Sequence, residues 1–299
     1  MKEYYIDQGS STIKVYEYNG ALTLLEEHSI YLKNGFTEEV GISSENKELL
    51  YEYYKSIKNK YNMNYTNTNI FATGIFRNLN HEQKKSIIKD FNDKFDLHFN
   101  IISHGIENYY LGKAMDNDYQ GKKVMIINMG GKTTELVTFK DNKIIDRKNL
   151  KVGVADLLSE FPKSNDEYSS VKIEDVVSFV RTKIEDVSFD RDYDCAIFTG
   201  GEERFEKLTG YNLLPNDIFN DGIHNYMVTM DDFIKGNNKI FFEISLKELY
   251  DMMPQNPKWM DGARLGAILP QAIFEKANIK YVIPSDLNLI NGVINDILV

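Results

Sequence analysis

The chain has 299 residues, of which 42% are hydrophobic and 27% charged, and its formal net charge at pH 7 is −10. This composition is typical of a soluble globular protein with a sizeable core, and the acidic excess argues against DNA as a partner, because nucleic-acid binding needs a basic surface. A small anionic ligand stays compatible with it, since a few local donors can outweigh a distant negative surface.

The ends and the cysteine content indicate a compartment. The N-terminus MKEYYIDQGS lacks the uninterrupted apolar core of a signal peptide, and no stretch approaches the roughly 18 apolar residues of a membrane span. The single cysteine, Cys195, cannot form a disulfide within the chain and fits a reducing environment. We therefore expect a cytoplasmic protein that has no membrane partner.

The first elements form a pattern that returns later in the chain. YYIDQGSSTIKVYEY reads as an apolar strand, a turn of glycine and hydroxyl residues, and an alternating strand; VMIINMGGKTTELVTF has the same outline. Asp7 corresponds to Asn128 and Gly9 to Gly130, and each pair is 121 residues apart (7 to 128, 9 to 130). A period of this size predicts two duplicated domains.

Strands and helices alternate after each copy of this pattern. In the first half we predict a helix through Leu49 to Tyr61, a strand ending at Gly74, and a helix opened by a capping box of Asn80 and Gln83. A strand from Phe99 to Ser103 and a helix from about Gly105 to Met115 follow.

The second half continues in the same way. A helical stripe covers 173–184, a buried strand runs from Asp194 to Gly201, and helices are predicted at 261–277 and from Ser285 to the end. The polar stretches 161–170 and 214–225 are predicted to be surface loops. We expect an α/β fold with domains 1–119 and 120–299, whose last helix could pack back on the first domain.

Four predicted strand ends carry small or hydroxyl residues, which suits anion binding. Glycines let the backbone approach a ligand, and successive N–H groups in such turns form a concavity for anions. A plain connecting turn is the alternative for any one of them. The four stretches are 7–12, 72–74, 130–134 and 199–201.

The order of these stretches resembles the actin/Hsp70/sugar-kinase class of folds, and within it the exopolyphosphatase/guanosine pentaphosphate phosphohydrolase family. The resemblance implies two duplicated actin-like (ribonuclease H-like) domains with a cleft between them, and Mg²⁺-assisted hydrolysis of a terminal phosphoanhydride there. Seven segments carry it, in the family's order: IDQGSSTIKVYEY, FATGIFRNLNH, IISHGIENYYLG, IINMGGKTTELV, LKVGVADL, FTGGEER and IPSDLNLINGVINDIL.

The resemblance also implies roles for particular residues. Mg²⁺ would be held by Asp7 and Glu135. Catalytic roles fall on Arg77, Glu107, Asn128 and Glu135. Phosphate would be bound by Asp7, Gly9, Ser10, Ser11, Gly130, Gly131, Lys132, Thr133, Gly200 and Gly201.

Some of these roles have alternatives, and two positions depart from the family pattern. Arg77 could instead form a surface ion pair, and Glu107 could be an ordinary carboxylate favoured by the first turn of a helix. Asn128 stands where the family has an acid, and Ile106 replaces the first of two adjacent glutamates. An amide carries no charge for Mg²⁺ and cannot act as a general base.

Three functions are compatible with this pattern. The preferred one is a hydrolase that releases terminal phosphate from polyphosphate, guanosine pentaphosphate or another nucleotide. The second is a binding protein of the same fold for such ligands, which the replacements at Asn128 and Ile106 favour. A filament-forming actin-like protein is weaker, because the segments match the phosphatase family. The oligomeric state is left open, with a homodimer as one option.

Overall fold

The computed structural model describes residues 2–141 and 143–297. The chain divides into two compact units, Met1–Glu107 and Asn108–Val299, which are called unit 1 and unit 2. None of the helices in the described ranges is both long enough and apolar enough to span a membrane.

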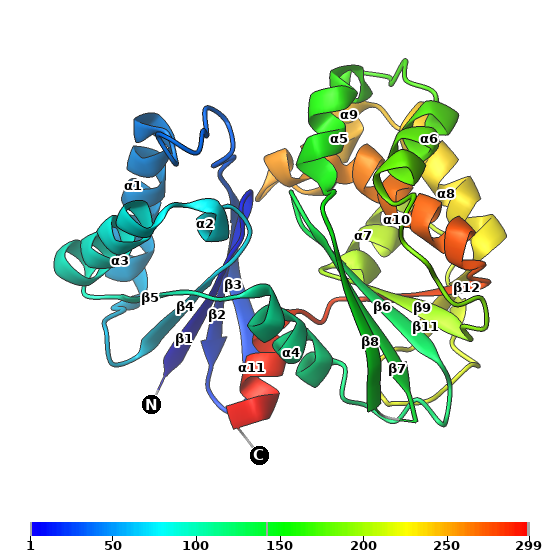
Figure 1. Ribbon diagram of the computed structural model, residues 1–299, viewed down its shortest axis with the longest axis horizontal. Coiled ribbons are helices and arrows are strands. Elements are labelled where there is room, and N and C mark those ends of the chain that lie inside the picture. Colours follow the sequence, from blue (N-terminus) through cyan, green and yellow to red (C-terminus); the bar gives the residue numbers. More distant parts are fainter. Residues whose placement is uncertain (1, 142, 298–299) are drawn as a thin grey trace. The chain divides into compact units, whose positions relative to one another are not determined.

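Unit 1 is built on a five-stranded mixed sheet in the order β3-β2-β1-β4-β5 (Figure 1). The first three strands form an antiparallel meander, and β4 and β5 continue the sheet in parallel from β1. The strands are β1 (Glu3–Gln8), β2 (Thr12–Tyr18), β3 (Leu22–Ser29), β4 (Thr68–Ala72) and β5 (His98–Ile101), and the helices are α1 (Ser44–Tyr61), α2 (Ile75–Asn78) and α3 (His81–Phe95).

Local signals set the helices of unit 1. The predicted capping box of α3 is confirmed, because the Asn80 side chain accepts the Gln83 N–H at 2.9 Å and the Gln83 side chain accepts the Asn80 N–H at 2.9 Å. The buried faces of α1 and α3 meet through Tyr54 and Phe91, whose rings pack edge to face with centroids 4.7 Å apart. This packing belongs to the apolar core of unit 1.

Unit 2 contains a seven-stranded mixed sheet in the order β10-β11-β12-β9-β6-β7-β8. The unit boundary falls within helix α4 (His104–Ala114). The strands are β6 (Val124–Met129), β7 (Thr134–Lys140), β8 (Lys143–Leu150), β9 (Cys195–Thr199), β10 (Leu214–Pro215), β11 (Tyr226–Thr229) and β12 (Tyr281–Ser285), and the further α-helices are α5 (Val154–Glu160), α6 (Ile173–Lys183), α7 (Glu202–Thr209), α8 (Met230–Phe242), α9 (Leu246–Met252), α10 (Ala263–Ala277) and α11 (Leu289–Ile297).

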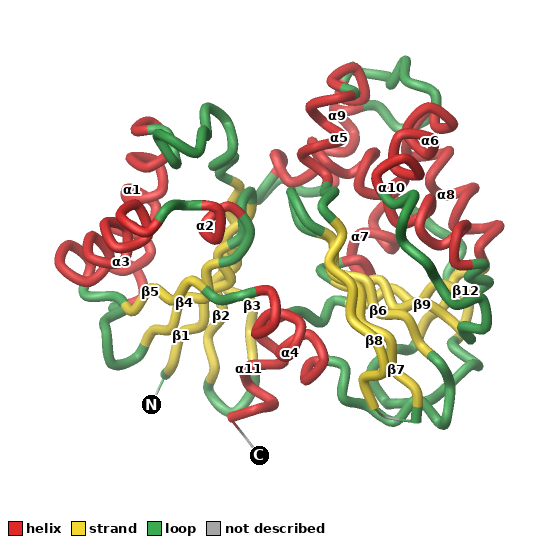
Figure 2. Tube along the Cα trace, in the orientation of Figure 1, coloured by secondary structure: helices red, strands yellow, loops and turns green. Residues whose placement is uncertain are grey.

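The two sheets repeat one topology, which confirms the α/β class and the duplication. In unit 1 the meander β1–β3 is followed by parallel strands β4 and β5; in unit 2 the meander β6–β8 is followed by parallel strands β9 and β12 (Figure 2). The glycine turns at 9–11 and 130–133 therefore each join the first two strands of their unit. The last helix, predicted from Ser285 to the end, begins at Leu289, and residues 298 and 299 lie outside the described residues.

One prediction about unit 2 holds only in part, because residues 216–225 form no helix or strand and are mostly exposed or half-buried, whereas the rest of the stretch departs from it. Residues 214–225 were expected to form a surface loop because Asn, Asp and Gly dominate the stretch. The structure pairs Leu214–Pro215 with β11 as strand β10 and buries Phe219 and His224. The polar groups of the segment can be buried because they bond to one another and to the end of β12, as described below.

Candidate functional site

The first glycine turn of unit 1 is fixed from two sides. The Gly9 N–H donates to the Thr12 carbonyl at 2.9 Å, which closes a tight connection between β1 and β2. The Ser10 hydroxyl accepts the Ile75 N–H at 2.8 Å, at the start of α2. Gly74 makes this approach possible, because it has a φ of +57° and a Cβ atom there would lie 2.1 Å from the Ser10 hydroxyl. The predicted segments 9–11 and 72–74 thus lie together.

Asp7 comes immediately before this turn and carries an unfavourable charge. It lies in β1 opposite Lys14 of β2 and Phe71 of β4. Desolvation raises the pKa of the Asp7 carboxyl to about 6; Lys14 opposes this increase, and Glu27 adds to it. A carboxylate that is poorly solvated and only partly compensated is suited to receiving a cation.

Arg77 and Glu107 meet, although thirty residues separate them in the chain. The guanidinium of Arg77 on α2 lies 2.5 Å from the Glu107 carboxylate in the first turn of α4, and the two side chains are only 11% and 10% exposed. His104 lies 4.0 Å from the same carboxylate oxygen. Arg77 therefore does form an ion pair, but a largely buried one, so that a phosphate near Arg77 would also be near Glu107.

The second glycine turn, in unit 2, repeats the first. The Gly130 N–H donates to the Thr133 carbonyl at 2.8 Å, just as Gly9 donates to Thr12 in unit 1. A Cβ atom at either glycine would approach the bonded carbonyl closely, at 3.1 Å for Gly9 and 3.2 Å for Gly130. The same backbone geometry thus occurs at equivalent positions of both copies.

A third segment, at the start of α5, forms hydrogen bonds to the second turn. The N–H groups of Val154 and Ala155, at the start of α5, donate to the carbonyls of Gly130 and Gly131 at 3.1 and 3.0 Å. Gly153 lies directly against the turn, and a Cβ atom there would be 2.4 Å from backbone atoms of Gly131 and Lys132. The LKVGVADL segment, which contains Gly153, therefore sets the position of the turn.

Lys132 in this turn contacts an acid. Its ammonium group pairs with the carboxylate of Asp156 on α5, and the same carboxylate accepts the Gly153 N–H at 3.1 Å. The Lys132 side chain remains 46% exposed. A role in phosphate binding, which stays a prediction, would require the ammonium to leave or share Asp156.

At one end of the unit 2 sheet, three predicted parts of the site come together: Asn128, Glu135 and the glycine pair Gly200–Gly201. Asn128 is opposite Glu135 of β7 in the antiparallel register and beside Thr199 of β9 in the parallel one. A Cβ atom at Gly200 would lie 3.7 Å from the Asn128 side-chain oxygen. Glu135 is buried, with an exposed fraction of 1%. The structure thus brings Asn128, Glu135 and Gly200 together within unit 2.

Gly200 and Gly201 lead into helix α7, and Asp286 holds its first turn. Both glycines have φ values near +120° (122° and 120°), a conformation that side chains rarely adopt. The Asp286 carboxylate accepts the Arg204 N–H at 3.1 Å, where a negative charge is favourable because it faces the free N–H groups of the helix. This position gives Asp286 a structural role at the start of α7.

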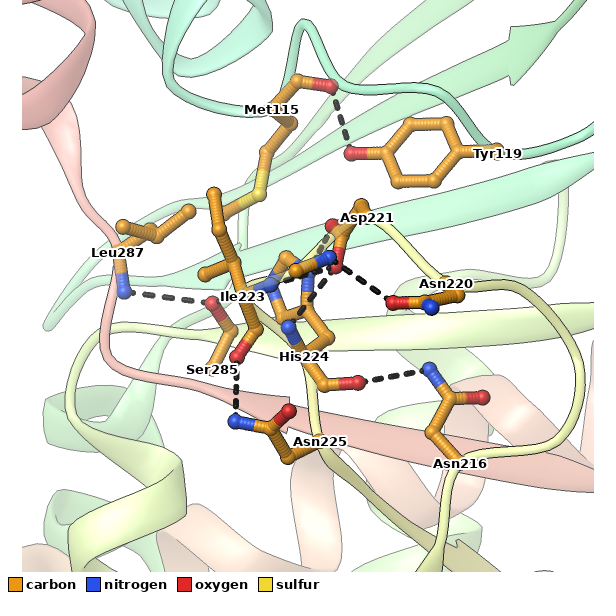
Figure 3. A network of polar contacts seen from close by, with 11 residues as sticks. Met115, Tyr119, Asn216, Asn220, Asp221, Ile223, His224, Asn225, Ser285 and Leu287 are labelled. Carbon is orange, nitrogen blue, oxygen red and sulfur yellow. Dashed lines mark hydrogen bonds and ion pairs between the residues drawn. The ribbon is translucent and has the colours of Figure 1, made fainter.

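A buried Asp–His–Ser chain fixes the strand end that presents Asp286 (Figure 3). His224 Nδ1 lies 2.6 Å from the Asp221 carboxylate, and His224 Nε2 lies 2.8 Å from the Ser285 hydroxyl. Burial raises the pKa of Asp221, but hydrogen bonds from His224 and the Ile223 backbone outweigh it, so that the pKa is lowered overall.

This chain has the bonding order of a serine-hydrolase triad, but its surroundings indicate a structural role. Ser285 and His224 are only 1% and 4% exposed, so that a substrate could not reach the hydroxyl. The Ser285 hydroxyl also accepts the Leu287 N–H at 3.2 Å. Sequence reasoning missed this network, because only His224 and Asp221 are close in the chain and neither has a recognisable spacing to Ser285.

Helix α7 also buries a carboxyl group that makes a testable contribution to stability. Glu206 is 1% exposed, and neither of its carboxylate oxygens has a hydrogen-bond partner among the described residues. Burial, and then the charges of Glu202 and Glu203, raise the pKa of Glu206 well above its ordinary value. The folded protein therefore favours the neutral acid.

Glu206→Gln is expected to stabilise unit 2 at pH 8 and to change little at pH 4.5. Because the folded pKa exceeds the unfolded one, the contribution of Glu206 is fully present below about pH 4.5 and is lost as the pH rises, at up to about 1.4 kcal/mol per pH unit until the folded pKa is reached. Thermal unfolding at several pH values measures the difference. Glu174→Gln, at an exposed position of α6, is the control; equal effects of both variants at pH 8 would contradict the expectation.

The comparisons with known proteins agree with this architecture. The profile of the Ppx/GppA phosphatase family matches residues 48–299. No curated protein matches the sequence. Among solved structures, a Ppx/GppA family member from Aquifex aeolicus is 20% identical with a TM-score of 0.70, covering 100% of this chain and 97% of that one.

Two further structures have higher TM-scores at lower identity. An exopolyphosphatase from Cytophaga hutchinsonii is 14% identical with a TM-score of 0.74, covering 100% of this chain and 98% of that one. An exopolyphosphatase-like protein is 14% identical with a TM-score of 0.75, covering 99% and 98%. At such identities the likeness of structures establishes the fold, and the family profile, which spans most of the chain, establishes the membership: the chain belongs to the Ppx/GppA phosphatase family and has the fold of these solved structures.

Proposed function

We propose that this protein is a hydrolase that releases terminal phosphate from polyphosphate, guanosine pentaphosphate or another nucleotide with the help of Mg²⁺. The observation that carries the proposal is the repeated turn, in which Gly9 and Gly130 make the same hydrogen bond to Thr12 and Thr133. Backbone N–H groups in such turns suit phosphate oxygens. Membership of a phosphatase family supports the same reading.

The acids of both units are suitable for magnesium. Mg²⁺ prefers carboxylate oxygens and keeps several of its waters. We propose Asp7 as a ligand of Mg²⁺ in unit 1 and Glu135 as a ligand of Mg²⁺ in unit 2. The raised pKa of Asp7, which results first from desolvation, supports this choice, because a bound cation would compensate a charge that the fold leaves poorly solvated. When bound, the ion would neutralise charge on the phosphate oxygens.

The remaining residues would position the substrate and the water. Arg77 would bind the terminal phosphate, for which its planar guanidinium is well suited. Glu107, held beside Arg77, would orient the attacking water and accept its proton. A bond forms between the water oxygen and the terminal phosphorus, while the anhydride P–O bond breaks and its electron pair leaves with the shortened chain. The turns at Gly9–Ser11 and Gly130–Thr133, and the pair Gly200–Gly201, would hold the phosphates.

The second candidate is a binding protein that keeps the phosphate-binding turns without efficient catalysis. Two observations favour it. Asn128, next to Glu135 and Gly200, has no charge to offer a metal, and Ile106, which precedes Glu107 on α4, is 45% exposed and cannot exchange a proton.

A comparison of the wild type with Asn128→Asp separates the two functions. If the protein is a hydrolase, the wild type releases phosphate from polyphosphate or guanosine pentaphosphate with Mg²⁺, and the restored acid changes the rate by less than about tenfold, because Asn128 already supplies an oxygen. If Asn128→Asp creates turnover that the wild type lacks, the wild type is a binding protein.

The assay needs a control for contaminating phosphatases. Glu107→Gln keeps the size of the side chain but removes the base, and it should reduce phosphate release about a hundredfold or more. Phosphate release that is unchanged in Glu107→Gln would come from another protein or from a mechanism that does not use this residue.

A further inference from the structure

A hollow of about 710 Å³ lies on unit 1, away from the glycine turns, between α3 and the edge strand β5. Figure 1 shows these two elements. None of its lining residues belongs to the turns at 9–11 or 72–74, or to the pair of Arg77 and Glu107. Its size falls within the range of pockets that take small molecules, about 300–1,000 Å³. The site is therefore separate from the residues proposed for hydrolysis. Its lining residues are Tyr65, His81, Lys84, Lys85, Ile88, Lys89, Asn92, Leu97, His98 and Phe99.

The floor of the hollow is apolar and aromatic. Leu97 and Phe99 are buried beneath it, whereas Tyr65 and Ile88 remain 49% and 41% exposed. The Tyr65 ring stacks on the ring of His98, with centroids 5.1 Å apart and an angle of 23° between the planes. The stacked pair of Tyr65 and His98, with the exposed side chain of Ile88, forms a surface on which a flat ring could lie.

Three lysines place positive charge on the rim of the hollow. Lys84, Lys85 and Lys89 all belong to α3, where Lys85 and Lys89 are exposed and Lys84 is half-buried, and within the described residues none of them is in an ion pair. Asp90 is on the same helix, but its carboxylate already pairs with Lys47 at 3.0 Å and Lys94 at 2.9 Å. In a chain with a net charge of −10, three unpaired ammonium groups around one hollow favour an anionic ligand.

The combination of floor and rim selects the class of anion. Inorganic polyphosphate could pair with the lysines. Its charged oxygens would also cover the apolar floor, and this contact would not add to the affinity because charged groups are not stabilised on an apolar surface. A nucleoside phosphate has both parts, because its base can stack on an aromatic surface and its phosphates can reach lysines. We propose that the hollow between α3 and β5 binds a nucleoside triphosphate, with the base over Tyr65 and Ile88 and the phosphates at Lys84, Lys85 and Lys89.

The proposal is tested by calorimetric titration with a β,γ-imido analogue of GTP, the same analogue of ATP, and inorganic tripolyphosphate, all without Mg²⁺. At least one nucleotide analogue should bind to the wild type. Lys89→Gln should weaken that binding about tenfold or more, which corresponds to about 1.4 kcal/mol, because the variant removes a charge-assisted hydrogen bond to a phosphate. Ile88→Asp should weaken it further, because it places a charge on the surface that receives the base.

Lys55→Gln is the matched control, since Lys55 is an exposed lysine of α1 in the same unit and outside the hollow. It should bind the analogue like the wild type, and Lys89→Gln should keep the wild-type rate of phosphate release from polyphosphate. Three results would overturn the proposal: no binding of either nucleotide, equal losses in Lys55→Gln and Lys89→Gln, or a loss of tripolyphosphate binding in Lys89→Gln as large as the loss of nucleotide binding. Loss of hydrolysis in Glu107→Gln with nucleotide binding intact would separate this site from the proposed function.

Discussion

Asp7→Asn is expected to stabilise unit 1 at pH 7.5 and, in the same variant, to reduce phosphate release about a hundredfold or more. Desolvation is the largest cause that raises the pKa of Asp7 from 3.8 to about 6, and it exceeds the opposing effect of Lys14. The folded pKa therefore lies above the unfolded one. The contribution of Asp7 to stability is fully present below about pH 3.8 and is lost as the pH rises to about 6, which amounts to about 3 kcal/mol.

The two effects have one cause. Asparagine has nearly the same shape as aspartate but carries no charge, so the folded protein no longer has to keep a poorly solvated carboxylate. The same change removes the proposed negative ligand of Mg²⁺, and the loss of one preorganised electrostatic group typically costs a factor of 10² to 10³ in rate. A stabilising change that abolishes activity is the expected signature of a strained functional group.

Calorimetric unfolding at pH 7.5 and pH 4, together with phosphate release in Mg²⁺, measures both effects. Asp93→Asn is the control, because Asp93 is an exposed carboxylate on α3 of the same unit. A lower melting temperature of Asp7→Asn at pH 7.5 would show that the charge is well compensated in the folded state. Unchanged phosphate release would remove Asp7 from the proposed site.

The repeated turns could be predicted from the sequence because local chemistry determines them. In each copy a strand is followed by a turn of glycine and hydroxyl residues and then by a second strand. Such a hairpin forms between neighbouring residues of the chain. Gly9 and Gly130 do adopt the same bond to Thr12 and Thr133, and the sheets around them repeat one order. The duplicated fold then follows from two similar local patterns.

The partners of the charged residues could not be predicted, because they come from distant parts of the chain. Nothing near Arg77 indicates Glu107, and nothing near Lys132 indicates Asp156. The burial of Phe219 and His224 inside the predicted loop 214–225 could not be predicted for the same reason. Its polar composition is typical of a surface loop, and only the approach of Ser285 at the end of β12 gives His224 the partner that makes its burial possible.

Gly153→Ala is expected to reduce phosphate release about a hundredfold through a residue that offers no side chain to the substrate. Gly153 has an extended backbone conformation, with φ of −148° and ψ of 177°, which alanine adopts freely. The expected loss of activity therefore comes from steric contact of the added Cβ atom and not from backbone strain. The added Cβ would lie 2.4 Å from the carbonyl carbon of Gly131 and the nitrogen of Lys132, so that the turn or the start of α5 has to move. Displacement of a positioning group by about 1 Å can cost about a hundredfold in rate.

Gly266→Ala separates this displacement from a general loss of packing in the same region. A Cβ at Gly266 would meet the end of the Met129 side chain at 3.3 Å and a methyl group of Val154 at 3.8 Å. A methionine can move aside, whereas the backbone of the Gly130–Thr133 turn cannot do so without losing its hydrogen bonds. Gly266→Ala should thus retain most of its phosphate release, and Gly153→Ala should lose it while unit 2 stays folded by circular dichroism. If Gly153→Ala releases phosphate at the wild-type rate, the position of this turn does not matter for hydrolysis, and the proposal that it holds the substrate fails with it.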